Sequence, residues 1–186
     1  MSREAPRPAH QSWVAAFVLF AVLAALGATA GIAGTGGSHS TVDAARATAK
    51  FHQLAVAKKS GYGLLQDKNG VACIAMDDMP GMGAMGVHYA KSSLVADGAL
   101  EASRPEALVY APKDGRLRLA AVEYVVLKSA WDANHTARPS LFGHAFNLTP
   151  SGNRFGLPAF YSLHAWIWKQ NPAGRFAIWN PEVTCR

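Results

Sequence analysis

The stretch ALVYAPKDGRLRLAAVEYVVL (107–127) decides the fold of this chain. It holds two apolar runs, 107–111 and 117–127, in which side chains alternate between two faces. The linker Pro112-Lys113-Asp114-Gly115 joins them, and its Asp-Gly pair suits the positive φ of a tight turn. The sequence therefore predicts an antiparallel β-hairpin.

Further strands are predicted on both sides of this hairpin. They are short runs with a period of two residues, and the last but one, AFYSLHAWIWK, is rich in aromatic side chains. These runs are 62–65, 71–75, 85–90, 159–169 and 176–179. Residues 128–158 are rich in Asn, Pro, Ser and Gly, and this composition predicts a long loop.

A helix is predicted before the strands. Ser40-Thr41-Val42-Asp43 has the form of a capping box, and Gly61 is suited to end the helix about twenty residues later. One helix followed by a run of strands indicates an α+β fold, with the N-terminal helix packed on an antiparallel sheet that could curl into a barrel. Residues 41–186 are expected to form a single domain.

The first forty residues indicate export. Residues 1–30 combine a basic start, an uninterrupted apolar run over 13–26 and the small residues Ala28-Thr29-Ala30, which is the pattern of a cleaved signal peptide. An uncleaved membrane anchor is the alternative. Both place the remaining chain outside the cytoplasm, as an extracellular or cell-envelope protein behind a flexible leader over 31–40.

The charge pattern bears on partners. The chain has 186 residues and a net charge of +6, but its basic residues are scattered and do not alternate with aromatics in a stripe. This distribution argues against nucleic-acid binding. Contact with a membrane is expected only through the N-terminal segment, if it is retained.

Two cysteines, Cys73 and Cys185, are the only ones in the chain. In an exported protein an even pair favours a disulfide, which here would close a loop across most of the domain. The alternative, two soft metal ligands, lacks the C-x-x-C spacing of a metal clip.

Three predicted strands each carry an ionisable residue near their middle, namely His88, Glu123 and His164. Alternation places Glu123 on one face with Leu117 and Leu119, and leaves the opposite face, with Arg118 and Tyr124, toward solvent. Since a buried carboxylate must be paired or bound, these three residues are a candidate metal site.

Two imidazoles and one carboxylate are a ligand set for zinc, non-haem iron or copper, and such a site could polarise a substrate or activate water. Whether the protein is an enzyme stays open. Each histidine could instead be an ordinary hydrogen-bonded core residue. Glu123 could pair with Arg104 or with one of the histidines.

Methionines recur every third residue before His88, and Met79, Met82 and Met85 are candidate copper ligands because thioethers bind Cu(I). They could equally fill space in a glycine-rich loop.

A different class of function is a non-enzymatic module that binds a small molecule in an aromatic pocket. Tyr89, Phe160, Trp166 and Trp168 are its candidate lining. A third class is a structural cell-envelope protein whose aromatics all belong to the core.

Several segments together resemble a family of uncharacterised exported bacterial proteins, largely actinobacterial. They are GAMGVHY (83–89), RPEALVY (104–110), VEYVV (122–126), PSLFG (139–143), LHAWIWK (163–169) and NPAGRFAIWNPEVTC (171–185). The resemblance covers about residues 44–185. It implies an exported location and places the three candidate metal ligands within shared motifs, but it implies no reaction.

Overall fold

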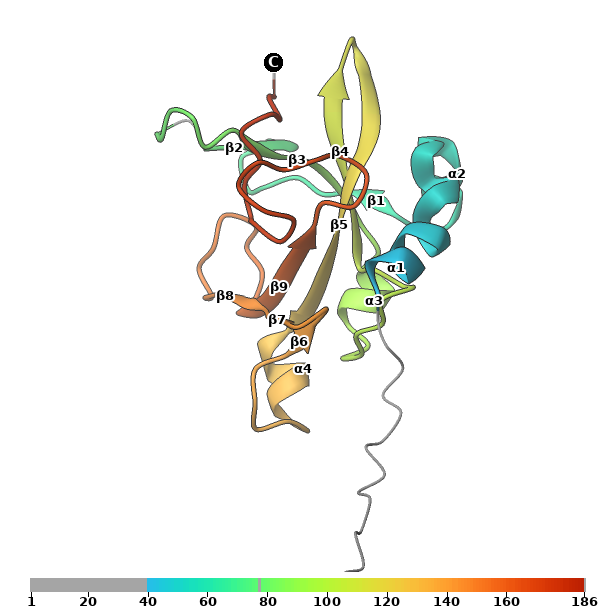
Figure 1. Ribbon diagram of the computed structural model, residues 1–186. Helices are drawn as coiled ribbons and strands as arrows, with labels where there is room; N and C mark the ends of the chain where they lie inside the picture. The colour runs from blue at the N-terminus through green and yellow to red at the C-terminus, as the bar shows by residue number, and fades with distance from the viewer. Residues whose placement is uncertain (1–39, 77, 186) are drawn as a thin grey trace, which may run out of the picture. The chain divides into compact units, whose positions relative to one another are not determined.

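An antiparallel sheet extends outward from the predicted hairpin, as shown by a computed structural model that describes residues 40–76 and 78–185 (Figure 1). The strand order is β1-β3-β4-β5-β9-β8, and β2 also pairs with β3. The strands are β1 (Gly63–Leu64), β2 (Cys73–Ala75), β3 (Ala84–Ala90), β4 (Ala107–Lys113), β5 (Arg116–Leu127), β8 (Asn147–Thr149) and β9 (Phe160–Ala165). A separate pair consists of β6 (Ser140–Leu141) and β7 (His144–Ala145).

The α+β class and the antiparallel pairing are thus confirmed. The expectation of a barrel is wrong, because β1 and β8 end the sheet and do not pair with each other among the described residues. The predicted loop over 128–158 contains α4 (Lys128–Asp132) as well as β6, β7 and β8. The predicted strand over 176–179 is not formed, and an isolated bridge joins the next residue, Asn180, to Ala84.

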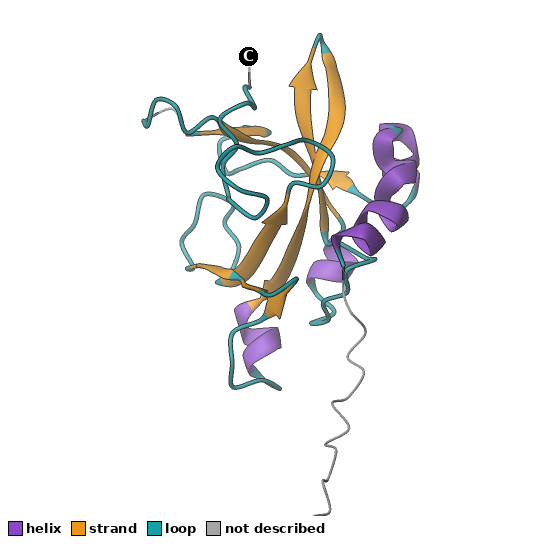
Figure 2. Ribbon diagram, in the orientation of Figure 1, coloured by secondary structure: helices purple, strands orange, loops and turns teal. Residues whose placement is uncertain are grey.

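The predicted N-terminal helix is divided into three parts, which lie together beside the sheet (Figure 2). They are α1 (Thr41–Thr48), the 3-10 helix η1 (Ala49–His52) and α2 (Leu54–Lys59). The capping box is confirmed: the Ser40 hydroxyl accepts from the Asp43 backbone N–H at 3.2 Å, and the Ser40 N–H donates to the Asp43 carboxylate. A short further helix, α3 (Ser92–Val95), follows β3.

A hydrogen bond from the sheet coincides with the break in this helix. The Tyr110 hydroxyl donates to the Phe51 carbonyl at 2.7 Å. In a continuous α-helix that carbonyl would accept the N–H of residue 55, four positions later. Gln53 is extended, with φ −89° and ψ 101°. The expectation of a single helix is therefore wrong.

Both faces of β5 are buried from Leu119 to Val126. On the helix side, Phe51, Tyr110 and Tyr124 belong to the larger hydrophobic core. Tyr124 is fully buried and its hydroxyl donates to the Ala102 carbonyl at 2.7 Å, so the expectation that this side faces solvent is wrong for Tyr124.

A β-bulge changes which residues of β5 share a face. The register between β4 and β5 shifts between Val109 and Tyr110, which leaves Ala120 as an extra residue. Leu119 consequently packs into the helix-side core, whereas Glu123 lies on the other face. Unbroken alternation would have placed Leu119 and Glu123 together, as the sequence alone suggested.

All described residues belong to one compact unit. The predicted signal peptide or anchor over 1–30 lies outside the described residues, and so does the predicted leader over 31–40 apart from Ser40. None of the helices in the described part of the chain is long and apolar enough to cross a membrane.

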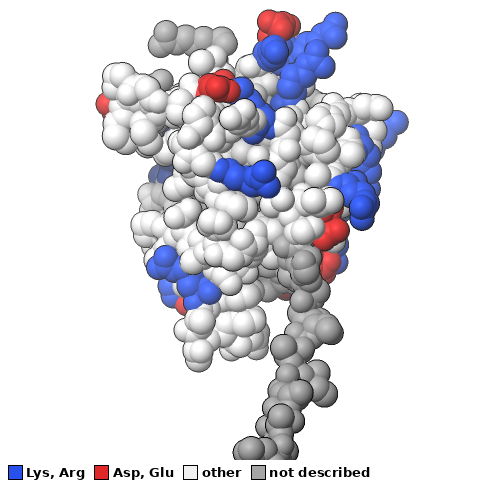
Figure 3. Space-filling view, viewed as in Figure 1, with Lys and Arg blue, Asp and Glu red and all other residues white. Residues whose placement is uncertain are grey.

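Basic side chains on the face shown in Figure 3 lie in separate groups, one of them at the tip of the β4–β5 hairpin, with uncharged surface between them. Lys113 and Arg116 flank that hairpin turn. On this face the basic residues thus form no continuous stripe.

The predicted disulfide is present. Cys73 of β2 and Cys185 are joined across a sequence separation of 112 residues, which ties the C-terminal segment to the sheet. A closed loop of this length restricts the unfolded chain, and in the chain-entropy view it is worth at most about 4–5 kcal/mol.

Replacing both cysteines, in Cys73→Ser/Cys185→Ser, is expected to lower the free energy of unfolding by up to about 4 kcal/mol. Guanidinium unfolding followed by tryptophan fluorescence measures the change, and the wild type in reducing buffer should match the variant. An unchanged midpoint in both samples would show that the cross-link contributes nothing to stability.

Candidate metal centre

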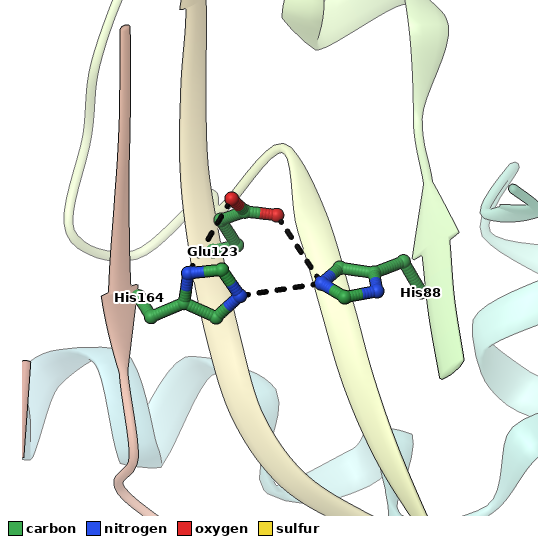
Figure 4. Close-up of side chains that lie close together, drawn as sticks. All are labelled: His88, Glu123 and His164. Atoms are coloured by element: carbon green, nitrogen blue, oxygen red, sulfur yellow. Dashed lines mark hydrogen bonds and ion pairs between the residues drawn. The ribbon is translucent and has the colours of Figure 1, made fainter. Parts of the chain in front are cut away.

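Three side chains from three strands meet on the face of the sheet opposite η1 and α2: His88 from β3, Glu123 from β5 and His164 from β9 (Figure 4). Nε2 of His88 lies 3.2 Å from Nε2 of His164 and 3.4 Å from Oε2 of Glu123. Nδ1 of His164 lies 3.5 Å from Oε1 of Glu123. The three candidate ligands that the sequence indicated are therefore brought together.

The strand register explains this convergence. Glu123 pairs directly with His164 across β5 and β9. On the other side Glu123 pairs with Ala107 of β4, and β4 separates Glu123 from β3. Ala107 has only a methyl group, so it leaves room beside Glu123. Figure 4 shows the His88 ring extending toward Glu123.

The spacing of the donor atoms suits a divalent metal. Two ligands each about 2.0–2.1 Å from a tetrahedral zinc ion lie roughly 3.3 Å apart. Nε2 of His88 is 3.2 Å and 3.4 Å from its two neighbours. One donor atom from each of the three residues fits within a mutual separation of 4.8 Å. The cluster can thus hold an ion with small movements of its side chains.

The histidines are held in the neutral form that metal binding requires. His88 is 3% exposed and His164 is 1% exposed. Burial lowers the pKa of each ring to about 4. For His88 the neighbouring His164 lowers the pKa further, while Glu123 and the Gly86 backbone oppose the shift.

The pKa of Glu123 shifts in the opposite direction. Burial raises its pKa, and the nearby His88 and a hydrogen bond from Ser162 only partly offset that rise. A buried carboxyl group is costly to ionise unless a positive charge is close by. A bound divalent cation would supply that charge.

Nδ1 of His88 is buried and, among the described residues, has no hydrogen-bond partner. The Gly86 backbone favours the charged ring without reaching hydrogen-bond geometry. Histidines that bind a metal through one ring nitrogen usually donate the N–H of the other ring nitrogen to an oxygen. His164 comes nearer to this arrangement, because its two ring nitrogens face Glu123 and His88.

A cavity of about 210 Å³ adjoins the cluster. Glu123 and His88 line it, together with Ser162 and mostly apolar side chains, whereas His164 is not part of its lining. The cluster therefore has an accessible side, which is formed by Glu123 and His88.

The candidate copper ligands are not gathered at this site. Met79 and Met82 lie in the turn before β3 and are 47% and 37% exposed. Only Met85 lines the cavity beside His88. The regular spacing of the methionines thus does not bring the thioethers of Met79 and Met82 to the two histidines.

The four aromatic residues proposed as a ligand pocket do not line one common pocket. Phe160 lines the cavity, but Tyr89 belongs to the helix-side core because it alternates with His88 along β3. Trp166 is buried next to His164 in the smaller core. The Trp168 indole donates to the Thr48 hydroxyl.

Sequence reasoning missed a second buried carboxyl group, that of Glu106. It is 2% exposed and accepts the Val125 N–H at 2.9 Å. Burial, and to a smaller degree Asp97, raises its pKa to about 8, against the opposing effects of the Val125 N–H and Arg104. Strand alternation did not indicate its burial, because Glu106 directly precedes the predicted strand. Arg104, a possible partner of Glu123, instead pairs with Asp97 and Glu101.

Comparison with known proteins finds no family model, no curated protein and no solved structure that matches the chain. Its function must therefore be inferred from the chemistry of its own residues.

In metal-free protein, His88 and His164 are expected to remain neutral until about pH 4. Their folded pKa lies below the unfolded value of about 6.5, so this pair reduces the free energy of unfolding as the pH falls from about 6.5 to 4. Imidazole ¹⁵N chemical shifts across this range measure the protonation directly. Titration of either ring near pH 6.5 would contradict the account.

Glu106 is expected to make the folded protein less stable as the pH rises, whereas the two histidines make it less stable as the pH falls. Between about pH 4.5 and 8 the unfolded chain releases a proton that folded Glu106 keeps, so stability falls as the pH rises through this window. This change in the free energy of unfolding is at most roughly 1.4 kcal/mol per pH unit, and Glu106→Gln should remove it. Urea unfolding at several pH values compares the two proteins, and parallel curves would refute the assignment.

Proposed function

We propose that this chain is an exported metal-binding protein in which His88, Glu123 and His164 hold one divalent transition metal. The observation that carries the proposal is a buried cluster in which one donor atom from each residue lies within 4.8 Å of the other two. Within it, Nε2 of His88 is 3.2 Å from Nε2 of His164 and 3.4 Å from Oε2 of Glu123. Two neutral imidazoles bind a cation without first losing protons, and the cation would neutralise the Glu123 carboxylate.

The ligand set favours zinc or iron(II). Two histidines and a carboxylate that leave a position open are common to catalytic zinc sites and to non-haem iron sites. Copper would be compatible with the imidazoles, but it would lack the thioethers of Met79 and Met82, which do not line the cavity beside His88.

An ion at this position would act as a Lewis acid on a polar group entering from the cavity. Glu123 and His88 would fix its position from the cavity side, and His164 would do so from behind. The sheet register holds Glu123 and His164 directly opposite each other, so little reorganisation of the backbone is required.

Export is the second part of the proposal. It is supported by the predicted signal peptide over 1–30 and by the disulfide, which is typical of oxidising compartments. The resemblance to exported bacterial proteins agrees with it.

Metal content tests the proposal. Untagged protein exported to an oxidising compartment should contain about one equivalent of zinc or iron by plasma mass spectrometry, and His88→Ala/His164→Ala should contain less than a tenth of that amount. The matched control is His135→Ala/His144→Ala, which removes two exposed histidines outside the cluster.

Retention of the metal in the cluster variant, or its loss in the control, would assign the metal to another site. Wild-type protein that takes up no zinc, iron or copper even after incubation would overturn the proposal. Circular dichroism of each variant separates loss of metal from loss of fold.

A further inference from the structure

The cavity beside the candidate metal centre is lined by several segments that lie far apart in the sequence. Ala90, Ala107 and Val125 form its floor on β3, β4 and β5. Val95 of α3 and Leu157 close it from above the sheet. Its lining is therefore built from at least five separate segments and is part of the fold.

The floor is hollow because two of its side chains are small. Ala90 and Ala107 pair with each other across β3 and β4, and Ala107 also pairs with Glu123. Larger side chains at these positions would fill the space next to the carboxylate. On the other side of the cluster the same sheet face is packed, with Val109, Ala121 and Trp166 in a buried core.

The volume sets the size of an occupant. A cavity of about 150 Å³ lined by apolar side chains accommodates benzene. This cavity has a volume of about 210 Å³, so it fits one ring with a few additional heavy atoms, or a short hydrocarbon chain.

The lining also sets the charge of an occupant. His88 and Glu123 are the only ionisable residues among its described lining residues, and neither a lysine nor an arginine is present. In the metal-free protein an anionic group would find no opposite charge there, and any charged group would lose its hydration among apolar walls. A neutral group can exchange hydrogen bonds with Glu123, His88 and Ser162.

We propose that the cavity binds a small uncharged molecule, with one ring or a short hydrocarbon chain, whose single hydroxyl or carbonyl group meets Glu123 and His88. The position of the polar group rests on the proposed metal centre, whereas the apolar part of the site does not. The apolar part excludes water from the accessible side of the cluster and holds the polar group against it.

Calorimetric titration of the full-chain protein with 4-ethylphenol and ethylbenzene tests this proposal, in metal-free and zinc-loaded samples. Both compounds should bind with one-to-one stoichiometry. The phenol should bind about three- to tenfold more tightly, since its hydroxyl adds a hydrogen bond that ethylbenzene cannot make. The anion 4-ethylbenzoate should bind metal-free protein more weakly than either.

Ala90→Leu should weaken 4-ethylphenol at least tenfold by filling the floor. Ala96→Leu is the matched control, because Ala96 is exposed just beyond α3 and should leave binding unchanged. Val95→Phe fills the same cavity from the opposite wall and serves as a second variant if Ala90→Leu disturbs the strand.

Absence of saturable binding by either compound would overturn the inference, and so would equal binding by wild type, Ala90→Leu and Val95→Phe. Metal analysis of the same samples keeps the two proposals distinct. Zinc uptake without phenol binding contradicts only the ligand inference. Phenol binding by a protein that never takes up metal contradicts only the metal centre.

Discussion

The structure depends on keeping the carboxyl group of Glu123 out of water between two imidazole rings. A lone carboxylate in such surroundings would cost several kcal/mol, and burial indeed raises its pKa. His88 and His164 are themselves neutral at physiological pH, so they offer dipoles but little positive charge. The two neutral rings therefore leave a charge deficit beside Glu123 that the proposed divalent cation would fill. This deficit links the fold to the proposed function.

The rest of the domain holds that arrangement in place. β5 is covered on both faces, by the helix-side core and by the smaller core that contains Trp166. The bulge at Ala120 shifts the alternation of side chains along β5. Its extra residue places Glu123 on the face opposite the one that buries Leu119. The Ala120 carbonyl in turn accepts the N–H groups of Trp168 and Lys169, which fixes the chain just after β9. The strands that carry the cluster are thus anchored close to it.

Much of this could be predicted from the sequence, and what could not has identifiable causes. Local signals gave the capping box at Ser40, the hairpin around Asp114 and the mid-strand positions of the three candidate ligands. The break in the helix could not be predicted, because it accompanies a hydrogen bond from Tyr110 of a distant strand. Strand alternation failed on β5 because a bulge leaves no mark in the spacing of apolar residues.

For the candidate site, too, the positions along each strand were predictable and the contacts between strands were not. Period-two alternation placed His88, Glu123 and His164 each on one face of a strand, but their meeting depends on strand order, which spacing along the chain does not encode. The cavity depends on two alanines, Ala90 and Ala107, whose importance lies in what they leave empty. The methionine repeat was a regular pattern in the sequence, and yet Met79 and Met82 remain in an exposed turn.

The most direct test of the central claim is X-ray absorption spectroscopy at the edge of whichever metal the exported protein contains. The account predicts a first shell of nitrogen and oxygen at about 2.0–2.2 Å, with the outer-shell scattering of two imidazole rings and no sulfur ligand. A first shell that contains sulfur, or fewer than two imidazoles, would contradict the assignment of His88, Glu123 and His164 as the metal ligands.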